Sequence, residues 1–151
     1  MNALAIIRPD DWNLAIFFHV LGAMVATGGL VLALAYLSLA WKGDSLAQFR
    51  AGYKALLWAA IPGFIVMRVA AQWIYSEQNW DAVDPPPSWI DIGFIVGDAG
   101  LLFLLIATIT AGVSTRRGGA GTAAVRVTTS LTALLLVAYV VSVWAMTAKP
   151  I

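Results

Sequence analysis

The stretch LAIFFHVLGAMVATGGLVLALAYLSLAW, from Leu14 to Trp41, contains no Asp, Glu, Lys or Arg. A helix that crosses the hydrocarbon core of a bilayer needs about 20 mostly apolar residues. Three further stretches meet this requirement, at 56–76, 90–113 and 124–147. Because backbone N–H and C=O groups must be paired inside a bilayer, runs of this length are expected to be helices. The sequence therefore predicts an all-α integral membrane four-helix bundle that forms a single transmembrane domain over residues 1–151.

The composition excludes several classes of protein. Of the 151 residues, 61% are hydrophobic and 11% are charged, whereas a soluble domain carries about 25% charged residues. A soluble enzyme and a disordered tail are therefore excluded. The net charge of +1 supplies no basic field for a nucleic acid. The chain has no cysteine for a disulfide or thiolate metal site, and no Gly-x-Ser-x-Gly, P-loop or His-Glu-x-x-His motif, which argues against an enzyme.

The charged residues between the spans predict an orientation. The segment 42–55 carries Lys42, Arg50 and Lys54 against one acid, and the segment 114–123 carries Arg116 and Arg117. The segment 77–89 carries three acids and no base. By the positive-inside rule, loops 42–55 and 114–123 are cytoplasmic, and the N-terminus and C-terminus are both extracytoplasmic. We expect a multi-pass protein of a cell membrane, the bacterial inner membrane.

Two features shape the second span. Asp44 and Ser45 are residue types that start helices, so the helix is expected to begin there and to extend the span on the cytoplasmic side. Pro62 has no backbone N–H to donate, and it predicts a kink in this helix.

Small residues recur at helical spacing on two spans. They are Gly22, Ala26, Gly29 and Ala33 on the first span and Gly93, Gly97 and Gly100 on the third. Helices associate in lipid by close approach at such residues. The stripes predict packing within the bundle or self-association through Gly22, Gly29, Gly97 and Gly100, and the sequence does not decide between the two. Besides the lipid bilayer, a larger membrane complex is a candidate partner.

Ionisable residues inside a span are expensive and indicate function. With a rise of about 1.5 Å per residue, His19 lies about 9 Å, and Arg68 and Asp98 about 12 Å, below the outer ends of their spans. Gln72 lies one helical turn from Arg68, and Tyr139 reaches the same level on the fourth span. The sequence predicts one buried polar cluster in the outer half of the bundle, made of His19, Arg68, Gln72, Asp98 and Tyr139.

Opposite charges at equal depth predict an ion pair between Arg68 and Asp98, which serves either the packing register or a function. Three interpretations compete for His19. It is a hydrogen-bonded core histidine, a proton relay beside Asp98, or a ligand of a metal or haem iron. Met67 and Met24 are the thioether candidates for a second ligand. The sequence leaves the metal unknown.

The residues Phe18-His19-Val20-Leu21-Gly22-Ala23, followed by Gly28-Gly29, and the ending Met146-Thr147-Ala148-Lys149-Pro150 resemble a family of small bacterial four-helix membrane proteins. That family is distantly similar to the CopD copper-resistance membrane proteins and the HemJ-type protoporphyrinogen oxidases. These share a first-helix histidine followed by paired glycines. Because this histidine is a haem ligand in the HemJ type, the resemblance implies His19 as a cofactor-binding residue, with haem b as the cofactor.

Three functions follow, in this order. The first is a non-catalytic accessory or assembly protein that carries a haem or metal at His19. The second is a small proton-coupled transporter or channel that uses His19, Arg68 and Asp98. The third is a HemJ-like membrane oxidoreductase.

Overall fold

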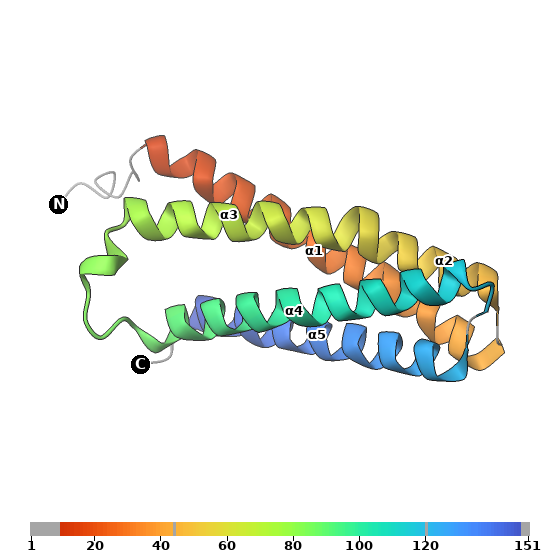
Figure 1. The fold of residues 1–151 in the computed structure, drawn as a ribbon. Coiled ribbons are helices and arrows are strands. Elements are labelled where there is room, and N and C mark those ends of the chain that lie inside the picture. The colour runs from red at the N-terminus through yellow and green to blue at the C-terminus, as the bar shows by residue number, and fades with distance from the viewer. Residues whose placement is uncertain (1–9, 44, 120, 149–151) are drawn as a thin grey trace.

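The computed structural model describes residues 10–43, 45–119 and 121–148, and no strand occurs among them. The chain runs through α1 (Asp10–Gly43), α2 (Leu46–Ala55), a π-helical turn η1 (Leu56–Ala60), α3 (Ile61–Glu77), a 3₁₀ turn η2 (Trp80–Ala82), α4 (Ser88–Arg116) and α5 (Thr122–Ala148). α2, η1 and α3 follow each other without a break and form one long helix (Figure 1).

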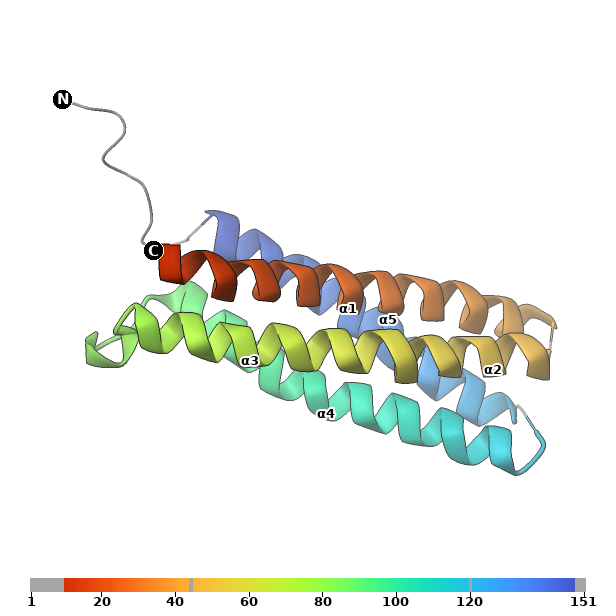
Figure 2. The same ribbon diagram turned by 90° about the horizontal axis from the view of Figure 1, so that it is seen from above.

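Four helical segments are long and apolar enough to cross a membrane: Leu14–Gly43, Leu46–Glu77, Ser88–Arg116 and Thr122–Ala148. This confirms the prediction of an all-helical chain with four membrane-length helices. Each segment extends beyond the apolar stretch that predicted it. The beginning of α1 and the end of α5 lie at the same end of the bundle, as an even number of crossings requires (Figures 1 and 2).

The second helix begins earlier than its apolar stretch. Ser45 caps α2, and its side chain accepts a hydrogen bond from the backbone N–H of Gln48. This confirms the prediction that the helix begins early and extends the second span, so that most of the segment 42–55 is helical, because the cap allows ten residues of modest hydrophobicity to join the helix. Asp44, the other predicted start, lies outside the described residues. Pro62 follows the π-helical turn η1, in which the N–H of Ile61 donates to the carbonyl of Leu56. A proline ring clashes with the carbonyl of the preceding helical turn, and its nitrogen has no hydrogen to donate. The wider π-helical turn accommodates both effects.

The helices pack as neighbouring pairs. α1 lies along α3, α4 lies along α5, and α1 also contacts α5. α3 and α4 touch each other only slightly, and Figure 1 shows their ribbons furthest apart at the end that carries η2. The bundle is therefore more open between α3 and α4, at that end, than between its other neighbouring helices.

Small residues bring α1 and α3 into backbone contact. Gly22, Ala26, Gly29 and Ala33 are all buried on α1. A Cβ atom added at Gly22 would lie 2.8 Å from the carbonyl oxygen of Gly63, and one added at Gly29 would lie 2.6 Å from the backbone nitrogen of Ala60. Gly22 and Gly29 are thus used within the chain, in a contact that leaves them no room for a second copy.

The α4 glycines serve a different purpose. A Cβ atom at Gly97 would lie 3.6 Å from Cδ of Arg68, and one at Gly100 would lie 3.6 Å from the hydroxyl of Tyr139. Both glycines are buried, but they face long side chains and not another helix backbone. They make room for two residues of the predicted polar cluster.

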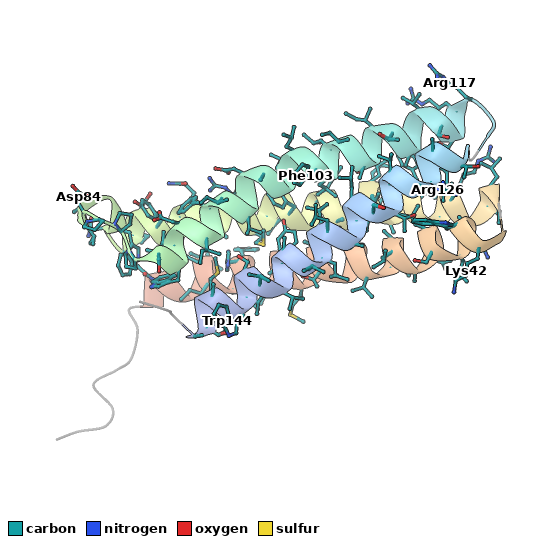
Figure 3. All side chains as sticks on the ribbon, turned by 90° about the horizontal axis from the view of Figure 1, so that it is seen from below. Lys42, Asp84, Phe103, Arg117, Arg126 and Trp144 are labelled. Carbon is teal, nitrogen blue, oxygen red and sulfur yellow. The ribbon has the colours of Figure 1, made fainter. Side chains whose placement is uncertain are left out.

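The two ends of the bundle differ in charge. Lys42, Arg117 and Arg126 lie at the end that joins α1 to α2 and α4 to α5 (Figure 3). Asp84 lies at the opposite end, in the connection between α3 and α4, and Trp144 lies toward that end on α5 (Figure 3). The charges that predicted the orientation are therefore separated along the length of the bundle.

Candidate functional site

A cavity of about 380 Å³ lies in the half of the bundle that carries η2. Its volume is within the range of small-molecule sites, about 300–1,000 Å³. All four long helices and η2 contribute to its wall, which is mostly apolar. The polar or sulfur-bearing side chains in that wall are His19, Thr27, Met67, Arg68, Tyr75, Gln78, Trp80, Trp89, Tyr139, Ser142 and Met146.

His19 enters this wall from α1. Its Nδ1 atom lies 3.0 Å from the backbone carbonyl oxygen of Met67 on α3. Because a carbonyl can only accept, Nδ1 is the nitrogen that carries the proton. In the neutral imidazole, Nε2 then keeps its lone pair free for a ligand or a donor. The contact is close because Gly22, one turn further along α1, admits the backbone of Met67.

Arg68 spans the opening between α3 and α4. Its Nε donates to Oδ1 of Asp98 at 3.2 Å, and its Nη1 donates to Oε1 of Gln72 at 3.2 Å. Its guanidinium carbon lies 4.7 Å from the ring centre of Phe94, in cation–π range. The predicted pairing of Arg68 with Asp98 is confirmed. The aromatic partner was missed, although Phe94 lies four residues before Asp98 and therefore on the same face of α4.

Tyr139 places a hydroxyl next to the cavity without a partner. The residue is 6% exposed, and among the described residues its hydroxyl finds no hydrogen-bond partner. Its ring packs edge-on against Phe64, with 6.4 Å between the ring centres. An unpaired buried hydroxyl costs about 1–3 kcal/mol. This hydroxyl is therefore a hydrogen-bonding group without a partner in a residue that lines the cavity.

Aromatic side chains surround the cavity on the side of η2. Trp80 packs edge-on against Trp89 at 5.6 Å, and its indole N–H donates to the side-chain oxygen of Gln78 at 2.6 Å. Tyr75 packs edge-on against Phe94 at 5.2 Å across the gap between α3 and α4. The contact between Tyr75 and Phe94 joins α3 to α4, and the contact between Trp80 and Trp89 joins η2 to α4.

The five residues predicted as one buried cluster occupy two places. His19, Arg68 and Tyr139 line the cavity. Gln72 and the Asp98 side chain, which is 70% exposed, lie on the outer surface of the chain. The prediction that all five are buried together is wrong for these two, because α3 and α4 are too far apart to cover them. His19 bonds to a backbone carbonyl and not to Asp98.

The other half of the bundle contains buried threonines. Thr108 donates to the carbonyl of Leu104, and Thr132 donates to that of Thr128. Both hydroxyls are buried and satisfied within their own helices. The Thr128 hydroxyl, one turn before Thr132, is also buried but finds no hydrogen-bond partner among the described residues.

The donor atoms around the cavity suit some cofactors better than others. Within residues 10–43, 45–119 and 121–148, no three His, Cys, Asp or Glu side chains come together so that they could hold a metal ion. One imidazole and the thioethers of Met67 and Met146 line the cavity, and such ligands suit haem iron or copper(I). Met24, the other predicted thioether, is 67% exposed and does not line the cavity.

Comparisons of the chain with protein-family models, with curated proteins and with solved structures found no match. The resemblance to the CopD and HemJ-type proteins therefore stays a prediction from the residues of the first span and the chain's end.

Proposed function

We propose that the protein is a non-catalytic accessory or assembly protein of a cell membrane, the bacterial inner membrane, and that it holds a haem or metal through His19. The observation that carries the proposal is the hydrogen bond from Nδ1 of His19 to the carbonyl of Met67. Histidines that ligate a metal almost always donate their other ring N–H to a carbonyl or carboxylate, which fixes the tautomer and the ring orientation. His19 has this arrangement at the wall of a cavity.

The remaining residues have complementary roles in this proposal. Nε2 of His19 supplies one ligand, and Met67 and Met146 are the candidates for a second. Arg68 offers a cation to a carboxylate of the bound group, and the Tyr139 hydroxyl offers a hydrogen bond. A bound haem would supply redox chemistry, and the chain's own residues would bind it and exclude water.

We infer that the end with Lys42, Arg117 and Arg126 faces the cytoplasm and that the cavity lies near the extracytoplasmic surface. The separation of charge along the bundle supports this orientation (Figure 3). Both termini would then be extracytoplasmic, and the segments 42–55 and 114–123 cytoplasmic.

Two alternatives rank lower. A proton-coupled transporter or channel is favoured by the charged pair of Arg68 and Asp98, but the hydroxyls of Thr108 and Thr132 beyond the cavity are bonded within their own helices and so are not free to pass a proton on. A HemJ-like oxidoreductase ranks last, because the resemblance of the first span alone favours it.

The first experiment is an absorption spectrum and a metal analysis of the protein, purified after expression with haem and copper supplied. A Soret band or stoichiometric copper is expected for the native chain and is expected to disappear in His19→Ala. Phe18→Ala is the matched control, because Phe18 is the neighbouring residue and is 39% exposed. A colourless and metal-free native preparation would refute the proposal.

The orientation is tested separately, using the absence of native cysteines. Val83→Cys and Gly119→Cys place single thiols at exposed positions near opposite ends of the bundle. A membrane-impermeant maleimide is expected to label the first in intact spheroplasts and the second only after permeabilisation. The reverse pattern would invert the proposed orientation.

A further inference from the structure

Asp98 presents a charge on the outer surface of a membrane-length helix. Its side chain is 70% exposed, and among the described residues Arg68 is its one hydrogen-bond partner. Arg68 is itself 28% exposed. In water such a pair would be unremarkable, but apolar side chains lie beside it on the surface of the bundle, with Val69 64% exposed and Ile95 67% exposed.

The position of Asp98 along α4 places it within the hydrocarbon. The helix has 29 residues, which corresponds to about 43 Å, against about 30 Å for the hydrocarbon core. If α4 is centred in the bilayer, its first 7 Å or so lie outside the hydrocarbon. Asp98 is ten residues from Ser88, about 15 Å along the axis, and so lies about 8 Å inside. A short carboxylate cannot reach the headgroups from there, whereas a long arginine side chain can.

We propose that a second copy of this chain covers this surface, so that the α3–α4 face forms a two-fold symmetric dimer interface in the membrane. This surface is defined by Val69 and Gln72 with Arg68 on α3, and by Ile95 and Asp98 on α4. The proposal shares Arg68 with the proposed cofactor site, but it needs no ligand at His19.

The symmetry of a membrane supplies the charge complementarity. Copies inserted in the same orientation are related by a two-fold axis along the membrane normal, which preserves depth. When two such faces meet across this axis, the α3 side of one copy lies opposite the α4 side of the other. Arg68 of one copy therefore faces the partner's Asp98, and Asp98 faces the partner's Arg68. Nε of Arg68 and Oδ1 of Asp98 lie 3.2 Å apart, on adjacent helices and at one depth. The dimer would therefore gather two cations and two anions into one network.

The glycine stripes provide no alternative face. Gly22 and Gly29 are in contact with the α3 backbone, and Gly97 and Gly100 are buried against side chains of the same chain. Self-association through these four glycines would require the bundle to separate. The α3–α4 face needs no such rearrangement, and it is where a partner would remove a charge from lipid.

The first test is cross-linking in native membranes with a short bismaleimide. Ile95→Cys places a thiol on the proposed face, three residues from Asp98, and leaves both charges intact. Val140→Cys is the matched control, because it is 61% exposed on α5, away from that face. A dimer is expected for Ile95→Cys, with at least tenfold less for Val140→Cys. A monomeric Ile95→Cys chain, or equal cross-linking of the two variants, would overturn the proposal.

The second test separates pairing between copies from pairing within one copy. Asp98→Arg chains present two cations, and Arg68→Asp chains present two anions, so each variant alone is expected to lose dimers at least tenfold. Co-expressed with different tags, they are expected to co-purify, since each cation then faces an anion of the other variant. Failure of the mixed pair to associate, with both chains folded, would refute the crossed arrangement. If either variant does not fold, the cross-linking result decides.

Discussion

Replacing Gly22 by alanine should separate α1 from α3 at the level of the candidate site. The new Cβ would clash with the backbone nitrogen of Met67 and would lie 2.8 Å from both the Met67 Cα and the Gly63 carbonyl oxygen. All three atoms belong to the backbone, so no side-chain rotation relieves the contact. Ordinary van der Waals contact begins at 3.4 Å, and the helices must therefore move apart by about 0.6 Å or more.

The cost follows from the contacts that this movement weakens. A radial gap of about 0.5–1 Å removes a quarter to a half of each atom–atom attraction, which is about 0.1–0.2 kcal/mol at best. A buried side chain makes about 40–60 such contacts. Weakening the equivalent of one side chain's contacts by a quarter to a third costs about 1–4 kcal/mol, and overpacked cores typically lose about 1–3 kcal/mol. We therefore expect Gly22→Ala to lower the free energy of unfolding by about 1–3 kcal/mol.

The assay is equilibrium unfolding in mixed detergent micelles, followed by tryptophan fluorescence. Gly28→Ala is the matched control, because Gly28 is exposed on α1 and no atom lies within 4 Å of its added Cβ. Helices of membrane proteins stay largely helical when their tertiary contacts are lost, so the difference in helix propensity between glycine and alanine should largely cancel. A difference below about 0.5 kcal/mol between the two variants would refute the close-contact argument.

The same substitution should also affect the site. Movement of Met67 away from α1 lengthens the 3.0 Å contact between its carbonyl and Nδ1 of His19. The imidazole then loses the partner that fixes its orientation, and outer-shell changes of this kind weaken metal binding by about 10–100-fold. Cofactor content should fall in Gly22→Ala and stay unchanged in Gly28→Ala.

Three other predictions concern single side chains. Tyr139→Phe removes a buried hydroxyl that has no partner among the described residues. It should leave the free energy of unfolding of the cofactor-free protein unchanged or raise it by up to about 1 kcal/mol, and a decrease of more than about 1 kcal/mol would show that the hydroxyl is bonded. Arg68→Leu alone should destabilise the fold by at least about 1 kcal/mol more than Arg68→Leu combined with Asp98→Leu, in the same assay; equal or greater damage in the double variant would exclude partnership. Ser45→Ala removes a 3.4 Å cap contact to the N–H of Gln48. It should speed hydrogen exchange at the start of α2 and lower the free energy of unfolding by about 0.5 kcal/mol, whereas unchanged exchange would mean that the cap contributes nothing.

The helices were predictable because length and apolar composition alone decide whether a segment can cross a bilayer. The first-span glycine stripe was predictable for a related reason, since only small residues allow backbones to approach closely. The pairing of Arg68 with Asp98 followed from equal depth and opposite charge. Each of these inferences uses position along a helix, which sequence spacing gives directly.

Other features depend on how each helix is rotated and on how far apart neighbours lie. The partner of His19 is a backbone carbonyl, and every residue carries one, so no residue type in the sequence points to it. The cavity exists because α3 and α4 diverge, with Gly93 and Gly97 on its α4 wall. Spacing predicted those glycines as helix-contact residues and gave no sign that they adjoin open volume.

The arrangement around Arg68 also limits what the polar residues can do together. His19 lies at the α1–α3 contact and Asp98 on the outer face of α4, and Arg68 is the side chain that both borders the cavity and touches Asp98. A proton relay from Asp98 to His19 would therefore have to pass the Arg68 guanidinium, which keeps its protons in proteins and accepts none. A relay would need a water chain around it through a mostly apolar wall. The geometry therefore favours the two roles that we propose over a relay, with His19 as a cofactor ligand and Asp98, through Arg68, as a contact to a second copy.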